Sequence, residues 1–261
     1  MPELPEVESA RRVLERASRG KTLAAVRLSH PSLRRGVSDA TLASLAGRRV
    51  ARVTRRGKHQ LLHLEGGGVV HVHFRMNGDW AVGRDGAPTP AYERASLTFT
   101  DGTRVSLVDS RALCTLTVHA SEEAALPELG LDATDPRLDA ATLGAALARR
   151  RIPIKVALLD QRVVAGLGNI YAAESLWHAR ISPLTPAASL GSARRARLVD
   201  GMRAVLAAAA SDPGRYGRGE APGRLEVYDR EGEPCSRCGS SIRRVVQAGR
   251  STYYCPACQR R

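Results

Sequence analysis

The first eight residues, Met1 to Glu8, place two prolines and three carboxylates at the very start of the chain. Removal of Met1, which a small second residue permits, would make Pro2 the N-terminus and its ring nitrogen a free secondary amine. A free amine with acids beside it is a nucleophile with its own proton carriers. Pro2 is therefore a candidate nucleophile, and the neighbouring glutamates are candidate acids and bases.

The segment from Glu3 to about Ser18 is predicted to be an amphipathic helix. Its apolar residues recur at three- and four-residue steps, at Val7, Ala10, Leu14 and Ala17. Pro2 would lie at or just before the first turn, where proline is tolerated. The positive end of a helix dipole disfavours a protonated amine, so the pKa of an α-amine there falls below its usual value of roughly 7.7–8.0. Ordinary helix-start composition is the alternative explanation, and on this stretch alone it is favoured.

The cysteines predict a metal site. Four of the five form two C-x2-C pairs with sixteen residues between them: Cys235, Cys238, Cys255 and Cys258. This spacing is typical of a zinc ribbon, in which two tight turns supply four thiolates to one tetrahedral ion. Two disulfides or a redox motif are the alternatives, and the lack of a secretory signal argues against disulfides. We expect one structural Zn²⁺, and we expect Cys114, in an alternating apolar stretch, to be a buried thiol.

The charge balance narrows the class of partner. The formal net charge is +14 and the pI is about 10.5. Such an excess attracts polyanions, and nucleic acid is the first candidate. A basic membrane-surface protein is the alternative, but the chain has no long apolar run and its N-terminus is acidic, unlike a signal peptide. We expect a soluble, intracellular protein without a membrane partner.

Lysine is rare among the 40 basic residues, because only Lys21, Lys58 and Lys155 are lysines. A GC-rich coding bias explains why arginine is used in place of lysine wherever only the positive charge matters. Arginine cannot release its proton in a protein, whereas lysine can, so a role in proton transfer would resist the exchange. Lys58 and Lys155 lie in segments that look functional on other grounds. Lys21, after the first helix, is predicted to interact with the dipole at its C-terminal end.

Residues 23–118 are predicted to form β structure, in a sandwich or a barrel. Seven short alternating or β-branched runs are separated by glycine, aspartate and arginine: Leu23–Leu28, Val50–Thr54, His59–Leu64, Val69–Phe74, Ser96–Thr100, Thr103–Val108 and Leu113–Val118. Within one run, His71, His73 and Arg75 share a face of the strand. The two histidines could bind a metal, but no third ligand is evident nearby. A polar, cationic sheet face is the favoured interpretation.

From about Pro136 the pattern becomes helical. The predicted helices are Arg137–Arg150, a short one after Pro153 that includes Lys155, Ile170–Arg180 and Ser189–Ala210. The turn from Gly166 to Asn169 is typical of a phosphate or anion cradle, because free N–H groups point outward at the start of a helix. An ordinary turn between two helices explains it equally well.

Residues 211–224 are rich in glycine, proline and charge, so we expect a flexible loop there. The zinc ribbon would follow, with a β-hairpin over Ser241 to Tyr254 that places Arg250 near its tip. An arginine at this position is either merely exposed or able to enter a groove of nucleic acid.

Together these segments resemble the formamidopyrimidine-DNA glycosylase and endonuclease VIII family of bifunctional base-excision repair enzymes, and more closely its formamidopyrimidine branch. The resemblance spans the whole chain. The matching motifs are PELPEVE at the start, Arg56-Gly57-Lys58, His73-Phe74-Arg75-Met76-Asn77-Gly78, Asp160-Gln161 through Tyr171, and the ribbon that ends in Tyr254-Cys255-Pro256-Ala257-Cys258-Gln259. Several independent motifs in the family's order argue strongly against a chance match.

The resemblance implies an α+β fold with DNA in its cleft. Residues 1–125 would form an N-terminal catalytic helix and β-sandwich. Residues 131–224 would form a helix-two-turn-helix domain with its linker loop, and residues 225–261 a C-terminal zinc ribbon.

The resemblance also implies the chemistry. Pro2 would attack C1′ of the damaged nucleotide and form an imine with the opened sugar. Glu3 would be the general acid and base, with Glu6 as a supporting carboxylate. The imine acidifies the 2′ proton, so elimination of the 3′ and then the 5′ phosphate follows. Lys58 would contact phosphate and assist this chemistry.

The remaining residues that the resemblance implies would contact DNA around an everted nucleotide. They are His73, Asn169 and Arg250 at the phosphates, Met76, Arg111 and Leu113 at the gap left in the base stack, Lys155 at the lesion pocket or its approaches, and Tyr171 elsewhere on the same surface.

Two departures from the formamidopyrimidine branch bear on specificity. Ser110-Arg111-Ala112-Leu113 stands where that branch usually has Pro-Arg-Arg-Phe, so leucine replaces the aromatic wedge and stacks less well. The segment 211–224 also lacks most of the loop that caps 8-oxoguanine in that branch. We expect activity on formamidopyrimidines, on abasic sites and on oxidised pyrimidines or hydantoins, and weak activity on 8-oxoguanine.

The sequence therefore predicts a DNA glycosylase with abasic-site lyase activity that needs no redox or nucleotide cofactor. It would act on damaged double-stranded DNA as a monomer, in the cytoplasm and associated with the nucleoid. The competing prediction is a catalytically inactive zinc-ribbon DNA-binding protein on the same scaffold. A third, weaker one is an RNA-associated ribbon protein.

Overall fold

The computed structural model describes residues 2–34, 36–211 and 225–260, so the expected loop at 211–224 lies almost wholly outside the described residues. The chain forms two compact units. The first unit contains Pro2 and Glu6–Pro127, and the second contains Glu3–Pro5 and residues 128–260. The boundary therefore crosses the backbone twice within the first turn of the chain, between Pro2 and Glu3 and again between Pro5 and Glu6.

Helix α1 spans Leu4–Ser18 and confirms the amphipathic pattern. Val7 and Leu14 are fully buried, whereas Glu8 and Arg11 lie on the other side and pair with each other. Arg11 also bonds Glu15 one turn later. Such pairs three and four residues apart support the exposed side of a helix while the apolar side packs.

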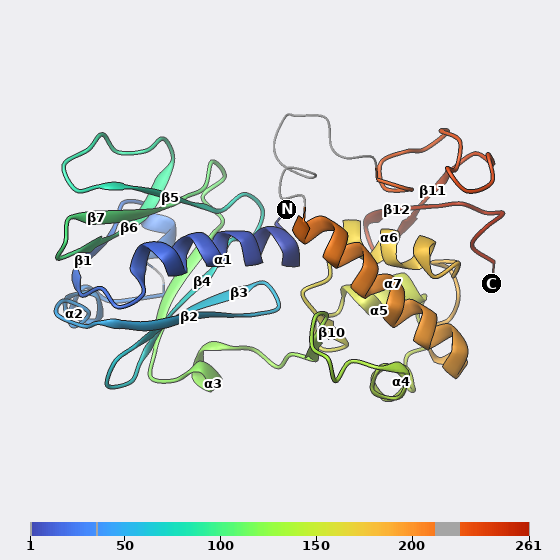
Figure 1. The fold of residues 1–261 in the computed structure, drawn as a ribbon, viewed down its shortest axis with the longest axis horizontal. Coiled ribbons are helices and arrows are strands. Elements are labelled where there is room, and N and C mark those ends of the chain that lie inside the picture. Colours follow the sequence, from blue (N-terminus) through green and yellow to red (C-terminus); the bar gives the residue numbers. More distant parts are fainter. Residues whose placement is uncertain (1, 35, 212–224, 261) are drawn as a thin grey trace. The chain divides into compact units, whose positions relative to one another are not determined.

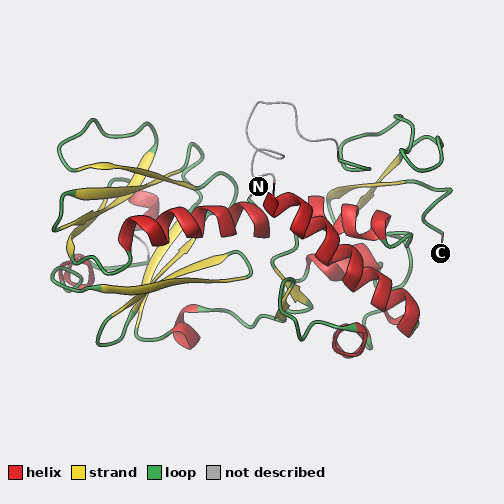
Figure 2. Cartoon of the chain, viewed as in Figure 1, coloured by secondary structure: helices red, strands yellow, loops and turns green. Residues whose placement is uncertain are grey.

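The first unit is a β-sandwich of two four-stranded antiparallel sheets (Figures 1 and 2). One sheet has the order β1-β6-β7-β5, and its strands are β1 (Leu23–Leu28), β6 (Glu93–Phe99), β7 (Thr103–Val108) and β5 (Asp79–Arg84). The other has the order β2-β3-β4-β8, and its strands are β2 (Val50–Arg56), β3 (His59–Leu64), β4 (Val69–His73) and β8 (Thr115–His119). This excludes the barrel, which the sequence left open.

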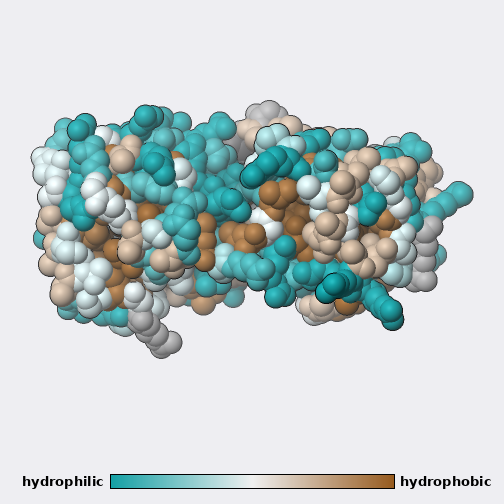
Figure 3. All heavy atoms as spheres, turned by 90° about the horizontal axis from the view of Figure 1, so that it is seen from below, coloured by the Kyte–Doolittle hydropathy of each residue, from teal (hydrophilic) through white to brown (hydrophobic). Residues whose placement is uncertain are grey.

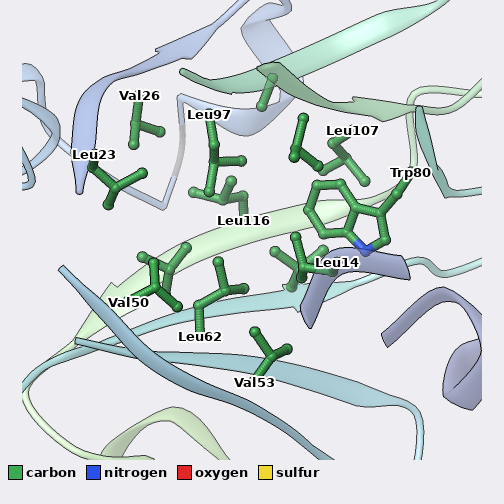
Figure 4. Packing of buried hydrophobic residues seen from close by; sticks show 14 of the residues in the cluster. Leu14, Leu23, Val26, Val50, Val53, Leu62, Trp80, Leu97, Leu107 and Leu116 are labelled. Carbon is green, nitrogen blue, oxygen red and sulfur yellow. The ribbon is translucent and has the colours of Figure 1, made fainter. Parts of the chain in front are cut away.

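The core of the first unit lies between the two sheets. Figure 4 shows side chains of both sheets pointing into this space, with Leu14 of α1 beside Trp80. Cys114 belongs to the same core and is buried, as expected for a structural thiol. Gln60, a polar residue in this interior, accepts a hydrogen bond from the Trp80 indole at 2.9 Å. The bond satisfies the indole N–H, which burial would otherwise leave unpaired.

Strand β5 was not predicted from the sequence. Only Trp80 of its six residues is buried, so no apolar alternation marks it, and its pairing with β7 defines it instead. Short elements on the rim of the sandwich were also missed. They are the 3₁₀ turn Pro31–Leu33 and helices α2 (Asp39–Ala43) and α3 (Glu122–Ala125).

The second unit is mainly helical around its own core. Its helices are α4 (Ala140–Leu147), α5 (Ile154–Leu159), α6 (Asn169–His178) and α7 (Ser192–Ser211), with a 3₁₀ turn at Ala187–Ser189. Two short parallel strands, β9 (Leu131–Asp132) and β10 (Val164–Ala165), pair with each other. Helix α4 is shorter than expected, because Asp139 caps it in a reciprocal capping box with Thr142.

The C-terminal part of the second unit is the expected ribbon hairpin. Strands β11 (Arg243–Gln247) and β12 (Arg250–Tyr254) are antiparallel and turn at Ala248 and Gly249, so Arg250 is the first residue after the turn. Glu174 of α6 is buried and accepts the backbone N–H groups of Glu226, Val227 and Tyr228 at 2.9–3.0 Å. This carboxylate ties the segment that precedes the ribbon to α6.

Among the described residues, no helix combines the length and the apolar character that crossing a bilayer requires. Hydrophilic residues, drawn in teal, cover much of the face shown in Figure 3, in keeping with the net charge of +14.

The sandwich core makes a direct stability prediction. Leu62→Ala, at a fully buried position of β3, should lower the free energy of unfolding of the first unit by about 2–5 kcal/mol, through lost apolar burial and the cavity left behind. Urea unfolding followed by Trp80 fluorescence in a Trp177→Phe background measures this unit. The control Val82→Ala, at a half-exposed position, should stay within about 0.5 kcal/mol. Equal effects of the two substitutions would contradict the assigned core.

Candidate active site and nucleic-acid interface

The candidate nucleophile Pro2 is half-buried and immediately precedes the turn into α1. Helix α1 begins at Leu4, and Pro5 is its second residue, where a missing N–H costs nothing. Glu6 is half-buried in the first turn, where a carboxylate interacts favourably with the helix dipole. The described structure thus places Pro2 where the sequence predicts it.

Glu3 is buried, with 2% of its surface exposed. Its carboxylate accepts three backbone N–H groups at the start of α6: Gly168 at 2.8 Å, Ile170 at 2.9 Å and Tyr171 at 3.2 Å. These N–H groups have no partner within the helix, so an anion at this position satisfies them and interacts with the positive end of the dipole. The glycine–asparagine turn is therefore an anion cradle, but its anion is the carboxylate of Glu3 rather than a phosphate.

Gly168 is required by this close approach. A Cβ built on it would lie 2.3 Å from the carboxyl carbon of Glu3, far inside contact distance. The absence of a side chain lets the carboxylate reach the backbone. This close approach explains why residue 168 is a glycine, which the sequence alone indicates only as part of a turn.

Lys155 is fully buried on α5 and joins three separate segments of the second unit. Its ammonium donates to the Oδ1 of Asn169, to the carbonyl oxygen of Ser251 at 3.1 Å and to the Oγ1 of Thr252 at 2.9 Å. All three N–H groups of the ammonium are thus used. Burial lowers the pKa of Lys155 to about 8, although the charge of Glu3 raises it.

Asn169 is held on two sides. Besides its bond from Lys155, its Nδ2 donates to the carbonyl oxygen of Ser251 at 3.0 Å. Ser251 is next to Arg250, which is exposed at the start of β12. The structure therefore brings together Lys155, Asn169 and the base of the Arg250 hairpin. Tyr171 lies in the same first turn of α6 with its side chain fully buried.

Lys58 lies in a two-residue turn between β2 and β3 that the sequence did not resolve. Arg56 pairs with His59 across the turn, and Gly57 has a φ of +56°, which suits the first position of a tight hairpin. Lys58 is 7% exposed. Arg55 beside the turn forms an ion pair with Glu8 of α1 at 3.1 Å. This pair ties the turn to the helix that begins after Pro2.

His73 ends β4, and its Nδ1 accepts the backbone N–H of Arg75 at 3.0 Å. Burial lowers the pKa of His73 to about 3, and the charges of His59 and Arg75 add to this effect. A neutral imidazole that accepts at Nδ1 has its proton on Nε2. His73 can therefore offer a neutral N–H donor to a ligand oxygen.

A hydrogen bond joins two loops of the first unit. Asn77, next to Met76, donates to the Oγ of Ser110, next to Arg111, at 2.8 Å. The structure thus brings together the two loops predicted to fill a gap in the base stack. The hydroxyl of Ser110 supplies the acceptor of this bond.

Asp109 fixes the second of these loops. Its carboxylate accepts the N–H groups of Arg111, Leu113 and Cys114 at 2.7–2.9 Å. Burial raises the pKa of Asp109, but the three donors outweigh this and hold it below its usual value. Arg111 is exposed, and Leu113 has 44% of its surface exposed. Sequence reasoning missed Asp109, although an aspartate before a turn is a common cap of backbone N–H groups.

The four ribbon cysteines form a metal site in the second unit. The sulfur atoms of Cys235, Cys238, Cys255 and Cys258 all lie within 4.8 Å of one another. Four thiolates about 2.3 Å from a tetrahedral zinc ion would lie about 3.8 Å apart, so the set fits this ion. The Trp177 indole N–H faces the Sγ of Cys235 at 3.5 Å, and the N–H of Cys258 faces the Sγ of Cys255 at 3.4 Å. Such donors stabilise thiolate charge around a metal.

Three family models match successive parts of the chain. They are the formamidopyrimidine-DNA glycosylase N-terminal domain over residues 1–116, the formamidopyrimidine-DNA glycosylase H2TH domain over residues 129–216, and the zinc finger found in FPG and IleRS over residues 232–261. Formamidopyrimidine-DNA glycosylases from Cereibacter sphaeroides and Geobacillus kaustophilus are 40% and 41% identical to this chain, and each alignment covers 100% of both chains.

The chain belongs to the formamidopyrimidine-DNA glycosylase family. Its fold agrees with solved members. Lactococcus lactis Fpg in complex with DNA that contains an abasic site is 29% identical with a TM-score of 0.89, and MutM in complex with DNA that contains carbocyclic 8-oxo-G is 31% identical with a TM-score of 0.90. Both comparisons cover 100% of each chain. The family's zinc finger and the four converging cysteines confirm the prediction of one structural zinc.

In this member of the glycosylase family, Gly168→Ala should displace Glu3. The added Cβ cannot fit beside the carboxyl group, so three N–H groups would lose their acceptor and the second unit should be destabilised by about 1–3 kcal/mol. Urea unfolding followed by Trp177 fluorescence in a Trp80→Phe background measures this. Gly191→Ala is the matched control, because its Cβ would meet nothing within 4 Å. A Gly168→Ala protein as stable as the control would refute the close approach.

The histidines of the first unit predict a pH dependence of stability. Burial lowers the pKa of His71 to about 4, and the charges of His59, His119 and Arg75 add to this. The unfolded chain has the ordinary value near 6.5, so it binds more protons than the folded chain between about pH 6.5 and 4. The free energy of unfolding should therefore fall as the pH drops through this range, by about 1.4 kcal/mol per pH unit for each additional proton bound by the unfolded chain.

His71→Gln should make this fall shallower. Urea unfolding of the first unit at several pH values between 7 and 4 gives the slope, and His178→Gln, at an exposed position of α6, is the control. Parallel curves for wild type and His71→Gln would show that His71 is not buried in its neutral form.

Proposed function

We propose that this chain is a bifunctional DNA glycosylase and abasic-site lyase of base-excision repair that acts on damaged double-stranded DNA. The observation that supports this most is the Pro2–Glu3 pair. Pro2 is a candidate amine nucleophile, and the carboxylate next to it in the chain is fixed by three N–H donors of α6. Membership of the family over the full chain supports the same conclusion.

The first chemical step makes a covalent bond to the sugar. With Met1 removed, the nitrogen of Pro2 attacks C1′ and passes its proton to the carboxylate of Glu3. The bond between C1′ and the base breaks with its electron pair leaving on the base, which takes a proton from water. Glu3 donates a proton to the ring oxygen of the sugar, the ring opens, and an iminium ion joins Pro2 to C1′. A fixed carboxylate suits this transfer, because reactivity falls steeply when the donor is misplaced.

The second step breaks the strand. The iminium withdraws electrons from C2′, so loss of a 2′ proton to a base expels the 3′ phosphate, and a second elimination expels the 5′ phosphate. Water then hydrolyses the iminium and frees the amine of Pro2. Glu3 is positioned to exchange the protons, and we assign Glu6 a supporting role and Lys58 a cationic contact with the leaving phosphate.

Most of the remaining predicted site residues would contact DNA. The exposed Arg250 and the fixed amide of Asn169 suit phosphate contacts, and His73 would add a neutral N–H donor. Met76, Arg111 and the exposed Leu113 would fill the gap beside an everted nucleotide, from two loops joined by the bond between Asn77 and Ser110. Lys155 and Tyr171 are buried, so we assign them the support of Asn169 and of the start of α6.

We also propose the division 1–125, 131–224 and 225–261, and a monomeric, nucleoid-associated protein in the cytoplasm. The boundary of the compact units after Pro127 and the three successive family models support the division. The net charge of +14 favours association with DNA throughout the nucleoid.

The covalent mechanism is tested with borohydride. When wild-type protein and abasic-site DNA are mixed and reduced with borohydride, a covalent protein–DNA adduct should be trapped, because reduction turns the iminium into a stable amine. Pro2→Gly should form the adduct far more slowly, and a variant that retains Met1 should form none. Denaturing gels measure the adduct, and mass spectrometry of the free protein shows whether Met1 is absent. Binding without any adduct would favour the inactive zinc-ribbon DNA-binding protein instead.

The lesion preference needs a separate test. We propose that formamidopyrimidine opposite cytosine is excised faster than 8-oxoguanine opposite cytosine, by more than about tenfold, because most of the capping loop is lacking from the sequence between α7 and the ribbon. Single-turnover rates on a panel of single-lesion duplexes, with an abasic duplex as the control for the lyase step, measure the preference. Comparable rates on the two purine lesions would refute the loop argument.

A further inference from the structure

Five of the seven histidines of the chain lie on one face of one sheet. They are His59 and His63 on β3, His71 and His73 on β4, and His119 on β8. Side chains alternate along a strand, and the intervening residues Leu62, Val70 and Val72 belong to the core, so these histidines occupy the outer face. The sequence pattern predicts a polar, cationic face here, and no third metal ligand beside His71 and His73 is evident from the sequence.

The structure supplies that third histidine. His59 is directly opposite His73 in the register of β3 and β4. Its ring packs edge-on to the ring of His73 with centroids 4.8 Å apart, and its Nδ1 lies 2.8 Å from the Nε2 of His71. His59 is therefore in contact with both histidines of the other strand.

This arrangement suits a metal ion. Two histidines two residues apart on a strand, with a third on the neighbouring strand, project three imidazoles from the same side of a rigid sheet. Three imidazoles and a water molecule are a common ligand set for zinc, and imidazole also suits copper and nickel. The sheet fixes the backbone, so only side-chain rotations separate the present arrangement from a chelating one.

The imidazoles are in the protonation state that binds metals. Burial lowers the pKa of His59 to about 4, and the charges of Arg75 and Lys58 add to this. Together with the low pKa values of His71 and His73, this leaves all three rings neutral near pH 7. A neutral imidazole has a lone pair available, whereas a protonated one has none.

We propose that His59, His71 and His73 form a binding site for one divalent transition-metal ion, separate from the four-cysteine zinc site. The ion would lie between the Nδ1 of His59 and the Nε2 of His71, and the proton between them would pass through solvent to the other nitrogen of the donor ring, so that both rings stay neutral. The Nδ1 of His73 would exchange the N–H of Arg75 for the ion. Lys58 and Arg75 add positive charge beside the site, so it selects ions with strong bonds to imidazole, such as Ni²⁺, Cu²⁺ and Zn²⁺, over Mg²⁺ and Ca²⁺.

The site would also regulate the proposed function, and this consequence rests on that function. If His73 contacts a DNA phosphate through its Nε2–H, the rotation of the ring that brings its Nδ1 onto the ion takes this donor away from DNA. Binding of the ion should therefore slow strand cleavage without changing the chemistry at Pro2.

The binding test uses the full-length, zinc-loaded chain without an affinity tag. After equilibrium dialysis against Ni²⁺ at neutral pH, elemental analysis should find one zinc and one nickel ion per chain. His71→Gln should bind nickel at least about tenfold more weakly, because one ligand is lost. His63→Gln is the matched control, since His63 lies on the same face but bonds Thr54 and faces Glu122. Circular dichroism checks that each variant is folded.

Three outcomes would overturn the site. They are no nickel bound to wild type, equal nickel binding by wild type and His71→Gln, and nickel bound only as zinc is lost. Each would leave the histidines as a polar sheet face.

Cleavage of abasic DNA separates the site from its regulatory consequence. Without nickel, wild type and His71→Gln should cleave at similar rates, because His71 takes no part in the proposed chemistry. With nickel, wild type should slow and His71→Gln should not. If nickel binds but cleavage does not slow, the metal site stands and the competition between the ion and DNA is rejected. If neither protein cleaves DNA in the absence of nickel, the proposed function is rejected instead.

Discussion

The candidate site depends on one interaction, the capture of the Glu3 carboxylate by the start of α6. Three backbone N–H groups that no helical carbonyl can satisfy converge on this side chain, and Gly168 leaves room for it. The interaction solves two problems at once. It caps a buried helix, and it fixes a carboxylate one peptide bond away from the candidate nucleophile. Glu3–Pro5 consequently belong to the second unit, whereas Pro2 and the rest of α1 belong to the first.

The same start of α6 organises the contacts proposed for DNA in the second unit. Asn169, its first residue, is held by Lys155 and by the hairpin that presents Arg250. In the first unit, Asp109 and the bond between Asn77 and Ser110 hold the loops of Met76, Arg111 and Leu113. In both units, the residues that would contact DNA are held in place by neighbouring residues that are buried or hydrogen-bonded. Such support reduces the conformational entropy lost on binding.

Local patterns explain what the sequence could predict. The apolar spacing of α1, the paired cysteines and the alternating runs of most strands each depend on residues within one element, and they correctly indicated the helix, the ribbon and the β structure. Strand β5 was missed because Trp80 is its only buried residue. For the glycine–asparagine turn the sequence left open a phosphate or anion cradle and an ordinary turn, because nothing local shows that Glu3, 165 positions earlier, occupies it. Asp109, Ser110 and His59 were missed for the same reason, since their importance depends on residues from other loops or strands.

The proposed mechanism requires Glu3 to act chemically as well as to cap α6. Glu3→Gln separates the two roles, because an amide oxygen can still accept backbone N–H groups but the side chain can no longer give or take a proton. The most direct measurement is the single-turnover rate of base release from a formamidopyrimidine duplex, with urea unfolding of the second unit as the check on structure. We expect near wild-type stability and a rate of base release lowered by about 10²–10⁴-fold. A wild-type rate in a stable Glu3→Gln protein would contradict it.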